Sequence, residues 1–250
     1  MEPSHLLALV PGRSAGWKYT RHVVELGTLR VPSGRLEASD PFVGLGQGLV
    51  FAVPPGDYPV AVTIADVSDA QNGSHLRETY LSVRLAEGAV ARVEFLVPDG
   101  REAPESDDEY YGVPVDAGTV GFADAEAVAR CMPGEATSWY DDVFDTGRDD
   151  SWFALMDSGE HHVDGAANVV MPLATGGENV VLSHSGWGDG YYPVVGAYDA
   201  DGVLLSVHID LQVDEPEDDH DGAASDAGAA EDDEPEQAKP SFWSRLFGKA

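Results

Sequence analysis

Apolar and polar residues alternate along much of the chain, and a period of two is typical of β-strands with one face on a core. The clearest alternation runs through 203–211, where every second residue is apolar: Val203, Leu205, Val207, Ile209 and Leu211. The segment 76–97 alternates on both sides of Glu87-Gly88, which predicts a hairpin turn between two paired strands. The pattern therefore predicts antiparallel sheets.

Residues that favour turns separate further apolar runs. Pro32-Ser33-Gly34 interrupts the run that begins at Val23, and PPGD at 54–57 separates LVFAV from YPVAVTIADV. Four more runs follow in the second half of the chain: ANVVMPLA, ENVVLSHS, YPVVGAYD and VLLSVHIDLQV. About ten or eleven short strands predict a mostly β protein with antiparallel β-sandwich-like sheets, arranged as one sandwich or as two packed β subdomains.

One short helix interrupts this β pattern. The sequence ADAEAVARCM predicts it over 124–132, because Asp124 can cap its first turn and Pro133-Gly134 ends it. The segment 137–156 fits either a helix or irregular structure and is rich in aromatic residues: Trp139, Tyr140, Trp152 and Phe153. Helix content is therefore expected to be small.

Composition divides the chain into five segments. The Pro-, Gly- and acid-rich segment 98–112 predicts a loop or linker between an N-terminal β subdomain, 1–97, and a C-terminal β subdomain, 113–213. Residues 214–240 are acidic and lack large apolar side chains, which predicts a disordered tether. The last segment, 241–250, predicts a short amphipathic peptide.

The terminal peptide follows Ser241, a suitable N-cap, with four bulky apolar residues at helical spacing: Phe242, Trp243, Leu246 and Phe247. An apolar patch at the end of a polar tether favours docking to a partner groove or to a membrane surface. The alternatives are that the peptide folds back onto the body or has no role.

The chain is strongly acidic, with a formal net charge of −31. Twelve acidic residues and no Lys or Arg lie between Asp214 and Glu236, yet residues 1–213 alone hold 33 acidic against 11 basic residues. So acidic a body repels phosphate backbones and anionic lipids, which excludes broad nucleic-acid binding. We expect an unknown protein partner of basic character, with a role in solubility alone as the alternative.

The single cysteine and the N-terminal sequence indicate the cellular compartment of the protein. Cys131 is the one cysteine in the sequence, so the chain cannot form an internal disulfide. The N-terminal residues lack the basic, apolar and small-residue regions of a signal peptide, and HLLALV at 5–10 is too short to span a bilayer. We therefore expect a cytoplasmic protein without a transmembrane segment.

Four stretches occur in the order of a known family's signature: LGTLRVPSGRLEASDP, VPPGDYPVAV, VPVDAGTVGFAD and SGWGDGYYPVVGAYDADG with VLLSVHIDL behind it. On these residues the sequence resembles the bacterial domain-of-unknown-function family 4241, over about residues 24–213. The usual final strand of that family ends like VVDF, where this chain has VHIDL. The resemblance implies a fold boundary near residue 213. Because the family has no established activity, it implies no catalytic residues and no cofactor.

The stretch HSGWGDGYYPVVGAYDADG at 184–202 is the strongest candidate for a functional site. Asp199-Ala200-Asp201-Gly202 matches half of the calcium-loop pattern, but the third carboxylate is missing and His208 stands where the ligating Glu belongs. A four-residue hairpin turn explains these residues fully, with Asp199 and Asp201 as the alternative metal ligands. The adjacent pair His161-His162 does not have the spacing of a zinc site, so we expect no metal.

A catalytic site is the alternative for this stretch. SHSGWGDG contains Ser, His and Asp, yet it is not a G-x-S-x-G elbow, and His184 and Ser185 point to opposite faces of a strand. A hydrolase or divalent-metal enzyme would use Asp116, Ser185 and Asp189. It requires Asp116, Asp189 and Asp199 to lie within about 5 Å of one another in a concave pocket.

The aromatic residues of 184–202 favour a contact surface: Trp187, Tyr191, Tyr192 and Tyr198. Rings on loops at the end of a β scaffold give a large contact area at a small entropic cost. The alternative is that they plug the end of the sandwich. We expect a non-catalytic protein-interaction module of an immunity or regulatory type, with the enzyme as the alternative.

Overall fold

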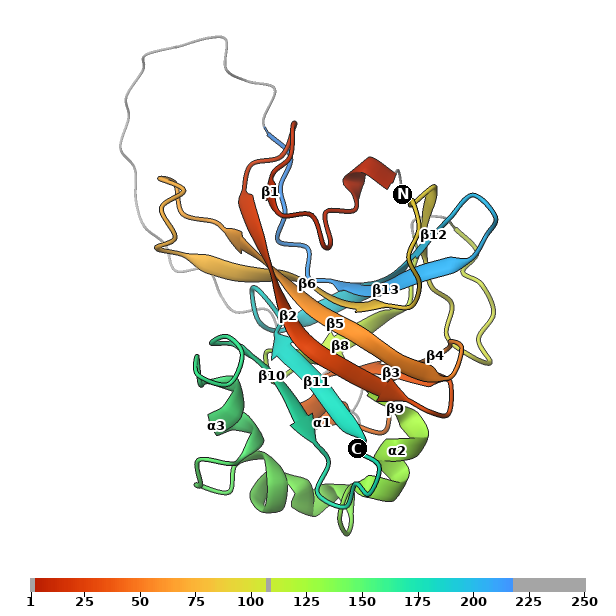
Figure 1. Cartoon of the computed structure of the whole chain (residues 1–250), viewed down its shortest axis with the longest axis vertical. Coiled ribbons are helices and arrows are strands. Elements are labelled where there is room, and N and C mark those ends of the chain that lie inside the picture. The colour runs from red at the N-terminus through yellow and green to blue at the C-terminus, as the bar shows by residue number, and fades with distance from the viewer. Residues whose placement is uncertain (1–2, 107–108, 218–250) are drawn as a thin grey trace, which may run out of the picture. The chain divides into compact units, whose positions relative to one another are not determined.

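Two antiparallel β-sheets carry the fold, which confirms the mostly β prediction (Figure 1). The computed structural model describes residues 3–106 and 109–217. The predicted tether from residue 218 to 240 and the predicted terminal peptide lie outside the described residues, and with them Phe242, Trp243, Leu246 and Phe247.

The larger sheet has eight strands, and seven of them follow one hydrogen-bonded path. In spatial order they are β1 (Gly12–Arg13), β2 (Thr20–Val31), β5 (Gly56–Asp66), β6 (Leu76–Arg84), β13 (Leu204–Asp210), β12 (Gly190–Tyr198) and β7 (Arg92–Phe95). The eighth, β8 (Gly112–Val115), also pairs with β12. The long β12 therefore has two short neighbours along one edge, β7 and β8.

The smaller sheet has five strands, in the order β10 (Ala166–Val170), β11 (Asn179–His184), β9 (Thr119–Asp124), β3 (Arg35–Ser39) and β4 (Leu49–Ala52). The main core lies between the sheets, because one cluster of buried side chains contains residues of both. It joins Leu36 and Phe122 of the smaller sheet to Val62, Leu81 and Ile209 of the larger one. The fold is therefore a sandwich of two sheets.

Short helices cover the outer face of the smaller sheet (Figure 1): α1 (Pro41–Gly44), α2 (Ala125–Cys131), η2 (Ala136–Ser138), η3 (Tyr140–Phe144) and α3 (Trp152–Met156). Helix α2 confirms the predicted helix, and Asp124 caps it as expected, since its Oδ1 accepts a hydrogen bond from the Ala127 N–H at 2.8 Å.

The aromatic segment 137–156 forms short helical turns that bury most of their rings. Trp139 and Trp152 lie in a second core, against the outer face of the smaller sheet. Phe153 stacks on the Phe42 ring, with 3.9 Å between centroids. Tyr140 is the exception, at 52% exposed.

The N-terminal segment covers part of the outer face of the larger sheet. It begins with a 3-10 helix, η1 (Pro3–His5), and Leu6 and Leu7 then pack with Tyr80 of β6 in a third cluster. Both faces of the sheet centre are thus covered. This explains the nearly continuous burial along β5, β6 and β13, where a strand with one wet face would alternate.

The predicted hairpin at Glu87-Gly88 is wrong. Strands β6 and β7 do not pair, because β13 and β12 lie between them in the sheet. After β6 the N–H groups of Leu85 and Ala86 donate to Leu205 O at 2.7 and 3.0 Å, and the chain passes the turn end of the β12–β13 hairpin to reach β7. Alternation identifies both strands, but it does not encode which strand is the partner.

The acidic segment 98–112 does not divide the two sheets. The larger sheet contains strands from before this segment and from after it, and the smaller sheet is mixed in the same way. One compact unit extends to Glu217. The predicted subdomains 1–97 and 113–213 are therefore interleaved in space.

The described body also extends past Asp214, where the tether was predicted to begin. Asp214 pairs with Arg21 at 2.9 Å, and Glu215 pairs with Lys18 at 2.8 Å. By composition, residues 214–217 are indistinguishable from the acidic run that follows them. Ion pairs with residues near the N-terminus nevertheless hold them on the body. We call 214–217 the C-terminal clasp.

Candidate functional site

Two buried carboxylates join the stretches that carry the family resemblance. Asp40 is 2% exposed, and its Oδ2 accepts from the N–H groups of Asp116 and Ala117 at 3.0 and 2.7 Å. Asp124 caps α2 with Oδ1 and accepts from the Ser33 N–H with Oδ2 at 2.7 Å. These bonds fix the first and third stretches to each other, so both carboxylates have structural roles.

The loop 185–189 lies beside this junction. The Ser185 N–H donates to Gly118 O at 3.0 Å, and Gly190 pairs with Val115 across β12 and β8. The loop and the turn before β9 form one wall of a cavity of about 510 Å³, which we call the Trp187 cleft. Its other walls come from the start of β6, the turn before β10 and the end of β11.

A carboxyl group and an imidazole meet in the wall of the Trp187 cleft. A Cβ atom on Gly165 would lie 2.7 Å from Glu78 Oε1 and 3.0 Å from His184 Nδ1, so both side chains close over this glycine. Burial raises the pKa of the Glu78 carboxyl, although a hydrogen bond from the residue's own backbone and the positive charge of Arg77 oppose the shift.

Two further carboxylates lie near His184 and Glu78. The Nε2 atom of His184 is 3.9 Å from Asp157 Oδ1. Asp164 lines the cleft next to Gly165, and its charge adds to the raised pKa of Glu78. The electrostatic character of this wall is therefore acidic.

Trp187 stands at the rim of the cleft and is 53% exposed. The Arg77 guanidinium carbon lies 5.3 Å from the centroid of its ring, within the range of a cation–π contact. His75 meets the ring edge-on, with 6.0 Å between centroids. In the described residues the Arg77 Nε atom is buried and has no hydrogen-bond partner. The structure thus surrounds this predicted contact residue with charged groups.

The residues predicted for catalysis do not form one site. Ser185 is fully buried, and its hydroxyl donates to Gly188 O at 2.7 Å, which turns it into the loop. Asp116 and Asp189 are neighbours, because the residues next to them are paired across β8 and β12. Asp199 follows the far end of β12, about 25 Å of strand away. The three aspartates therefore do not converge.

Asp199 and Asp201 lie in the turn between β12 and β13. Asp199 Oδ1 accepts from the N–H groups of Asp201 and Val203 at 2.9 and 2.8 Å, which is the geometry of a side chain that stabilises a turn. Within 3–106 and 109–217, no three His, Cys, Asp or Glu residues are grouped so that they could hold a metal ion.

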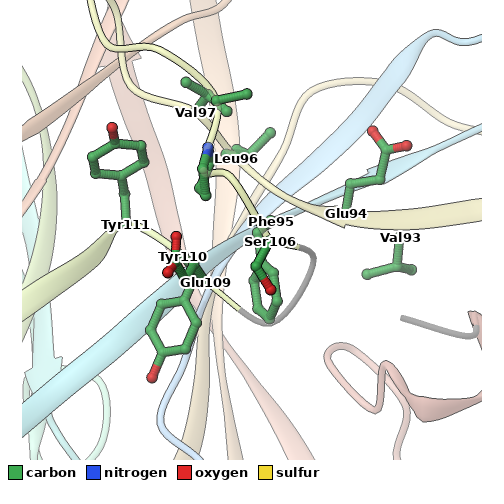
Figure 2. Close-up of a pocket in the computed structure, with 11 residues that line it drawn as sticks. Val93, Glu94, Phe95, Leu96, Val97, Ser106, Glu109, Tyr110 and Tyr111 are labelled. Carbon is green, nitrogen blue, oxygen red and sulfur yellow. The ribbon is translucent and has the colours of Figure 1, made fainter.

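Three aromatic rings contact one another in a row at the edge of the larger sheet, and Figure 2 shows two of them, Phe95 and Tyr110. Tyr110 stacks on Tyr191, and Phe95 is tilted against Tyr110. Phe95 ends β7, Tyr110 precedes β8 and Tyr191 lies in β12. The centroids of Phe95 and Tyr110 are 5.0 Å apart, and those of Tyr110 and Tyr191 are 5.8 Å apart. Tyr191 is 45% exposed, and the other two are half-buried. We call these three residues the aromatic row.

A second cavity, of about 370 Å³, opens beside the aromatic row (Figure 2). It lies between β7 and residues 103–106 and 109–111, and the exposed side chains of Glu94 and Glu109 line it. Glu94 pairs with Arg92 at 2.8 Å, and both are exposed. The cavity therefore combines a mainly apolar and aromatic lining with two acidic side chains.

The structure divides the aromatic residues that were predicted as one contact surface. Tyr192, which was predicted to be a contact residue, does not lie on the surface. It is 5% exposed and belongs to the main core, and its hydroxyl donates to Gly188 O at 2.8 Å. Side chains alternate along β12, so Tyr191 next to it faces outward. Tyr198 packs partly against the main core, with the Arg92 guanidinium 4.6 Å from its ring centroid.

Several residues of both sites were not singled out from the sequence: Arg77, Glu78, Asp164, Phe95 and Tyr110. They occupy ordinary positions in strands and loops, and the topology brings them together from distant segments. One signal was present for the row, since Tyr110 and Tyr111 are a pair of aromatic residues in an otherwise polar segment.

A family model described as "Protein of unknown function (DUF4241)" matches residues 29–209. The chain belongs to this family. The resemblance expected from the four sequence stretches is confirmed. No curated protein and no solved structure matches the chain.

The DUF4241 match runs from within β2 to within β13 and includes the Trp187 cleft and the aromatic row. The C-terminal clasp lies beyond it. In the part of the DUF4241 chain that the structure describes, no helix is long and apolar enough to cross a membrane.

Proposed function

We propose that this DUF4241 protein is a non-catalytic interaction module, of an immunity or regulatory type, that binds a basic protein partner through the aromatic row. The observation that carries the proposal is the row of contacting rings formed by Phe95, Tyr110 and Tyr191 at a sheet edge, with Tyr191 45% exposed. Rings that are already held in place lose little freedom when a partner covers them, so they favour binding.

Acidic side chains around the row support a basic partner. Glu109 lines the neighbouring cavity, and Glu102 and Glu105 are exposed on the segment 102–106 beside it. Glu94 also lines this cavity, although its charge is already paired with Arg92. Complementary charge speeds the encounter and rejects acidic proteins, while the aromatic contacts supply most of the affinity. A partner with Lys or Arg around an apolar patch fits this surface.

The state of the predicted catalytic residues supports binding over hydrolysis. The Ser185 hydroxyl is buried and bonded to Gly188 O, so it is not presented to a substrate as a nucleophile must be. Asp199 accepts two backbone N–H groups of its own turn, a structural role.

Affinity capture followed by calorimetry tests the proposal. The full chain is immobilised, the captured partner is purified, and its affinity is measured for the wild type and for the double variant Tyr110→Ala/Tyr191→Ala. Tyr140→Ala is the matched control, because Tyr140 is 52% exposed on η3, outside the row. We expect the double variant to bind at least about tenfold more weakly. We expect the control to match the wild type and high salt to weaken binding.

Three outcomes contradict the proposal. The double variant binds the partner as tightly as the wild type, the captured partner is acidic, or affinity is indifferent to salt. Circular dichroism melts of each variant show whether a weaker affinity reflects the contact or a loss of folding.

A further inference from the structure

The Trp187 cleft is a separate feature from the aromatic row and is large enough for a small ligand. Its volume of about 510 Å³ lies within the range of ligand pockets in proteins, which is roughly 300–1,000 Å³. Its groups come from three regions that the fold brings together: β6, the turn at 163–165 and the segment 184–188. Polar groups that converge on one cavity in this way are typical of a binding site.

We propose that the Trp187 cleft binds an organic cation, an alkylammonium or guanidinium group, between Glu78 and the ring of Trp187. The position of Glu78 supports the choice of charge. Among the described residues, no Lys or Arg nitrogen lies within 4.0 Å of its carboxylate, although the side chain is half-buried in the wall. A partly desolvated carboxylate without an ion pair is unfavourable, and a cation in the cleft offsets that cost.

Gly165 leaves room for the carboxylate in the wall of the cleft. The backbone of this glycine is fixed, since the Gly165 N–H donates to Met156 O at 2.9 Å and the His184 N–H donates to Gly165 O at 2.8 Å. Glu78 Oε1 and His184 Nδ1 both approach this glycine, where a Cβ atom would lie within 3.0 Å of each of them. The carboxylate and the imidazole therefore share a space that a side chain at this position would fill.

Trp187 supplies the second half of the site. Its ring is half exposed at the rim, and the chain's own Arg77 guanidinium lies 5.3 Å from the ring centroid. Arg77 shows that a guanidinium can lie over this ring, and a ligand cation contacts the part of the ring that stays exposed at the cleft. A cation between a carboxylate and an indole gains both an ion pair and a cation–π contact.

The other charges of the cleft exclude the alternatives. The carboxylates of Glu78 and Asp164 line the cavity together with the single guanidinium of Arg77, so an anionic ligand meets net repulsion. An inorganic metal ion prefers several carboxylate or imidazole ligands at once, and the described residues contain no group of three that could hold one. An organic cation needs one carboxylate and one ring, which the cleft provides.

Titration of the full chain with four probes tests the proposal. Agmatine and 1,5-diaminopentane represent a free guanidinium and a free ammonium, and capped Gly-Arg-Gly and Gly-Lys-Gly peptides represent the same groups on a protein. Glutarate serves as the anionic control and calcium chloride as the metal control. Binding is followed by calorimetry and by the indole N–H signal of Trp187, which is assigned by its loss in Trp187→Phe.

We expect at least one of the four cationic probes to bind and to shift the Trp187 indole signal, and Glu78→Gln to weaken that binding at least tenfold. Glu126→Gln is the matched control, because it removes the same charge from an exposed position on α2. Tighter binding of the free amines assigns the site to a small molecule, and tighter binding of the peptides assigns it to a Lys or Arg side chain of a protein.

The proposal is overturned if none of the four cations binds at concentrations up to about 10 mM, at which even a weak site would be occupied. It is also overturned if Glu126→Gln weakens binding as much as Glu78→Gln does, or if glutarate or calcium shifts the indole signal equally. The aromatic row has no part in these measurements. Failure here therefore leaves the proposed partner surface untouched, and failure of that surface leaves the cleft untouched.

Discussion

Arg21 and Asp214 form an ion pair in which both side chains are buried, with Arg21 Nη1 2.9 Å from Asp214 Oδ1 and exposures of 0% and 4%. The same guanidinium donates to Tyr19 O and to Ser14 Oγ at 3.2 and 2.7 Å. Because Arg21 begins β2 and Asp214 follows β13, the pair fastens the C-terminal clasp to the other end of the described chain.

Removal of one partner of this pair is expected to destabilise the fold strongly. Asp214→Ala leaves the Arg21 charge buried without its counter-ion, which costs about 3 kcal/mol of unfolding free energy. Glu215→Ala breaks the neighbouring pair with Lys18, where both side chains are about half exposed, and should cost no more than about 1 kcal/mol. Urea unfolding of both variants measures the difference, and equal losses would contradict the role of the buried pair.

Asp210 at the end of β13 should make the protein less stable as pH rises. Burial, with a smaller contribution from the Asp214 charge and against the hydrogen bond from the Gln212 N–H, raises the pKa of its carboxyl to about 6. The unfolded pKa is about 3.9, so the stabilising contribution is complete below pH 4 and is lost as pH rises through 6.

The variant Asp210→Asn isolates this effect, because its side-chain oxygen can still accept from the Gln212 N–H, a bond of 2.9 Å in the wild type. Between pH 4 and pH 7 we expect the unfolding free energy of the variant to rise by about 2 kcal/mol relative to that of the wild type. This is less than the full pKa shift would give, because part of Asp210 stays exposed to solvent. Urea unfolding at several pH values gives the unfolding free energy of both proteins as a function of pH. Parallel curves would contradict the prediction.

His208 should have the opposite effect and make the protein less stable as pH falls. It is 1% exposed between the hydroxyls of Ser82 and Ser206, each 2.7 Å from a ring nitrogen. Burial lowers the pKa of the imidazole to about 3, against about 6.5 when unfolded. Its stabilising contribution is therefore complete above pH 6.5 and is lost as pH falls towards 3.

His208→Gln retains hydrogen-bonding groups between the two serines but removes the titration. When the pH is lowered from 7 to 4.5, the unfolding free energy of the wild type is expected to fall by about 2 to 3 kcal/mol more than that of this variant. The measurement is again unfolding by urea at each pH. A variant that loses stability as steeply as the wild type shows that another group is responsible.

Gly165 should tolerate a side chain less well than another glycine of the same cleft. Gly165 and Gly188 have φ of +92° and +97°, so alanine strains both backbones by a similar amount. At Gly188 a Cβ meets nothing within 4 Å, whereas at Gly165 it collides with Glu78 and His184. We expect Gly165→Ala to cost at least about 1 kcal/mol more than Gly188→Ala in thermal or urea unfolding. Equal costs would mean that both side chains move aside freely.

Local signals in the sequence predicted local structure well. The cap at Asp124 and the strand within 203–211 appear where they were expected, because neighbouring residues alone determine them, although both faces of this strand are buried rather than one. The strand partners could not be predicted in this way, and the hairpin at Glu87-Gly88 failed because its two strands pair with a segment more than a hundred residues further along the chain.

The candidate sites show the same limit. Trp187 and Tyr191 could be singled out as aromatic residues among glycines, but Tyr192 beside them differs only in the face of β12 that it occupies. Glu78 resembles any polar residue of a strand until the fold places it against Gly165 and His184. In composition the acidic clasp at 214–217 resembles the run that follows it, and its basic partners near the N-terminus, Lys18 and Arg21, decide its structure.

The insertion of β13 and β12 between β6 and β7 has a consequence for synthesis of the protein. Strand β6 has an unfilled edge and β7 has no partner until the ribosome has released residues beyond 210. Such edges bind other chains readily, and contacts between distant residues form slowly. The nascent chain therefore stays vulnerable to misassociation until almost the whole DUF4241 region has emerged, and a truncation before β12 would leave that vulnerability permanent.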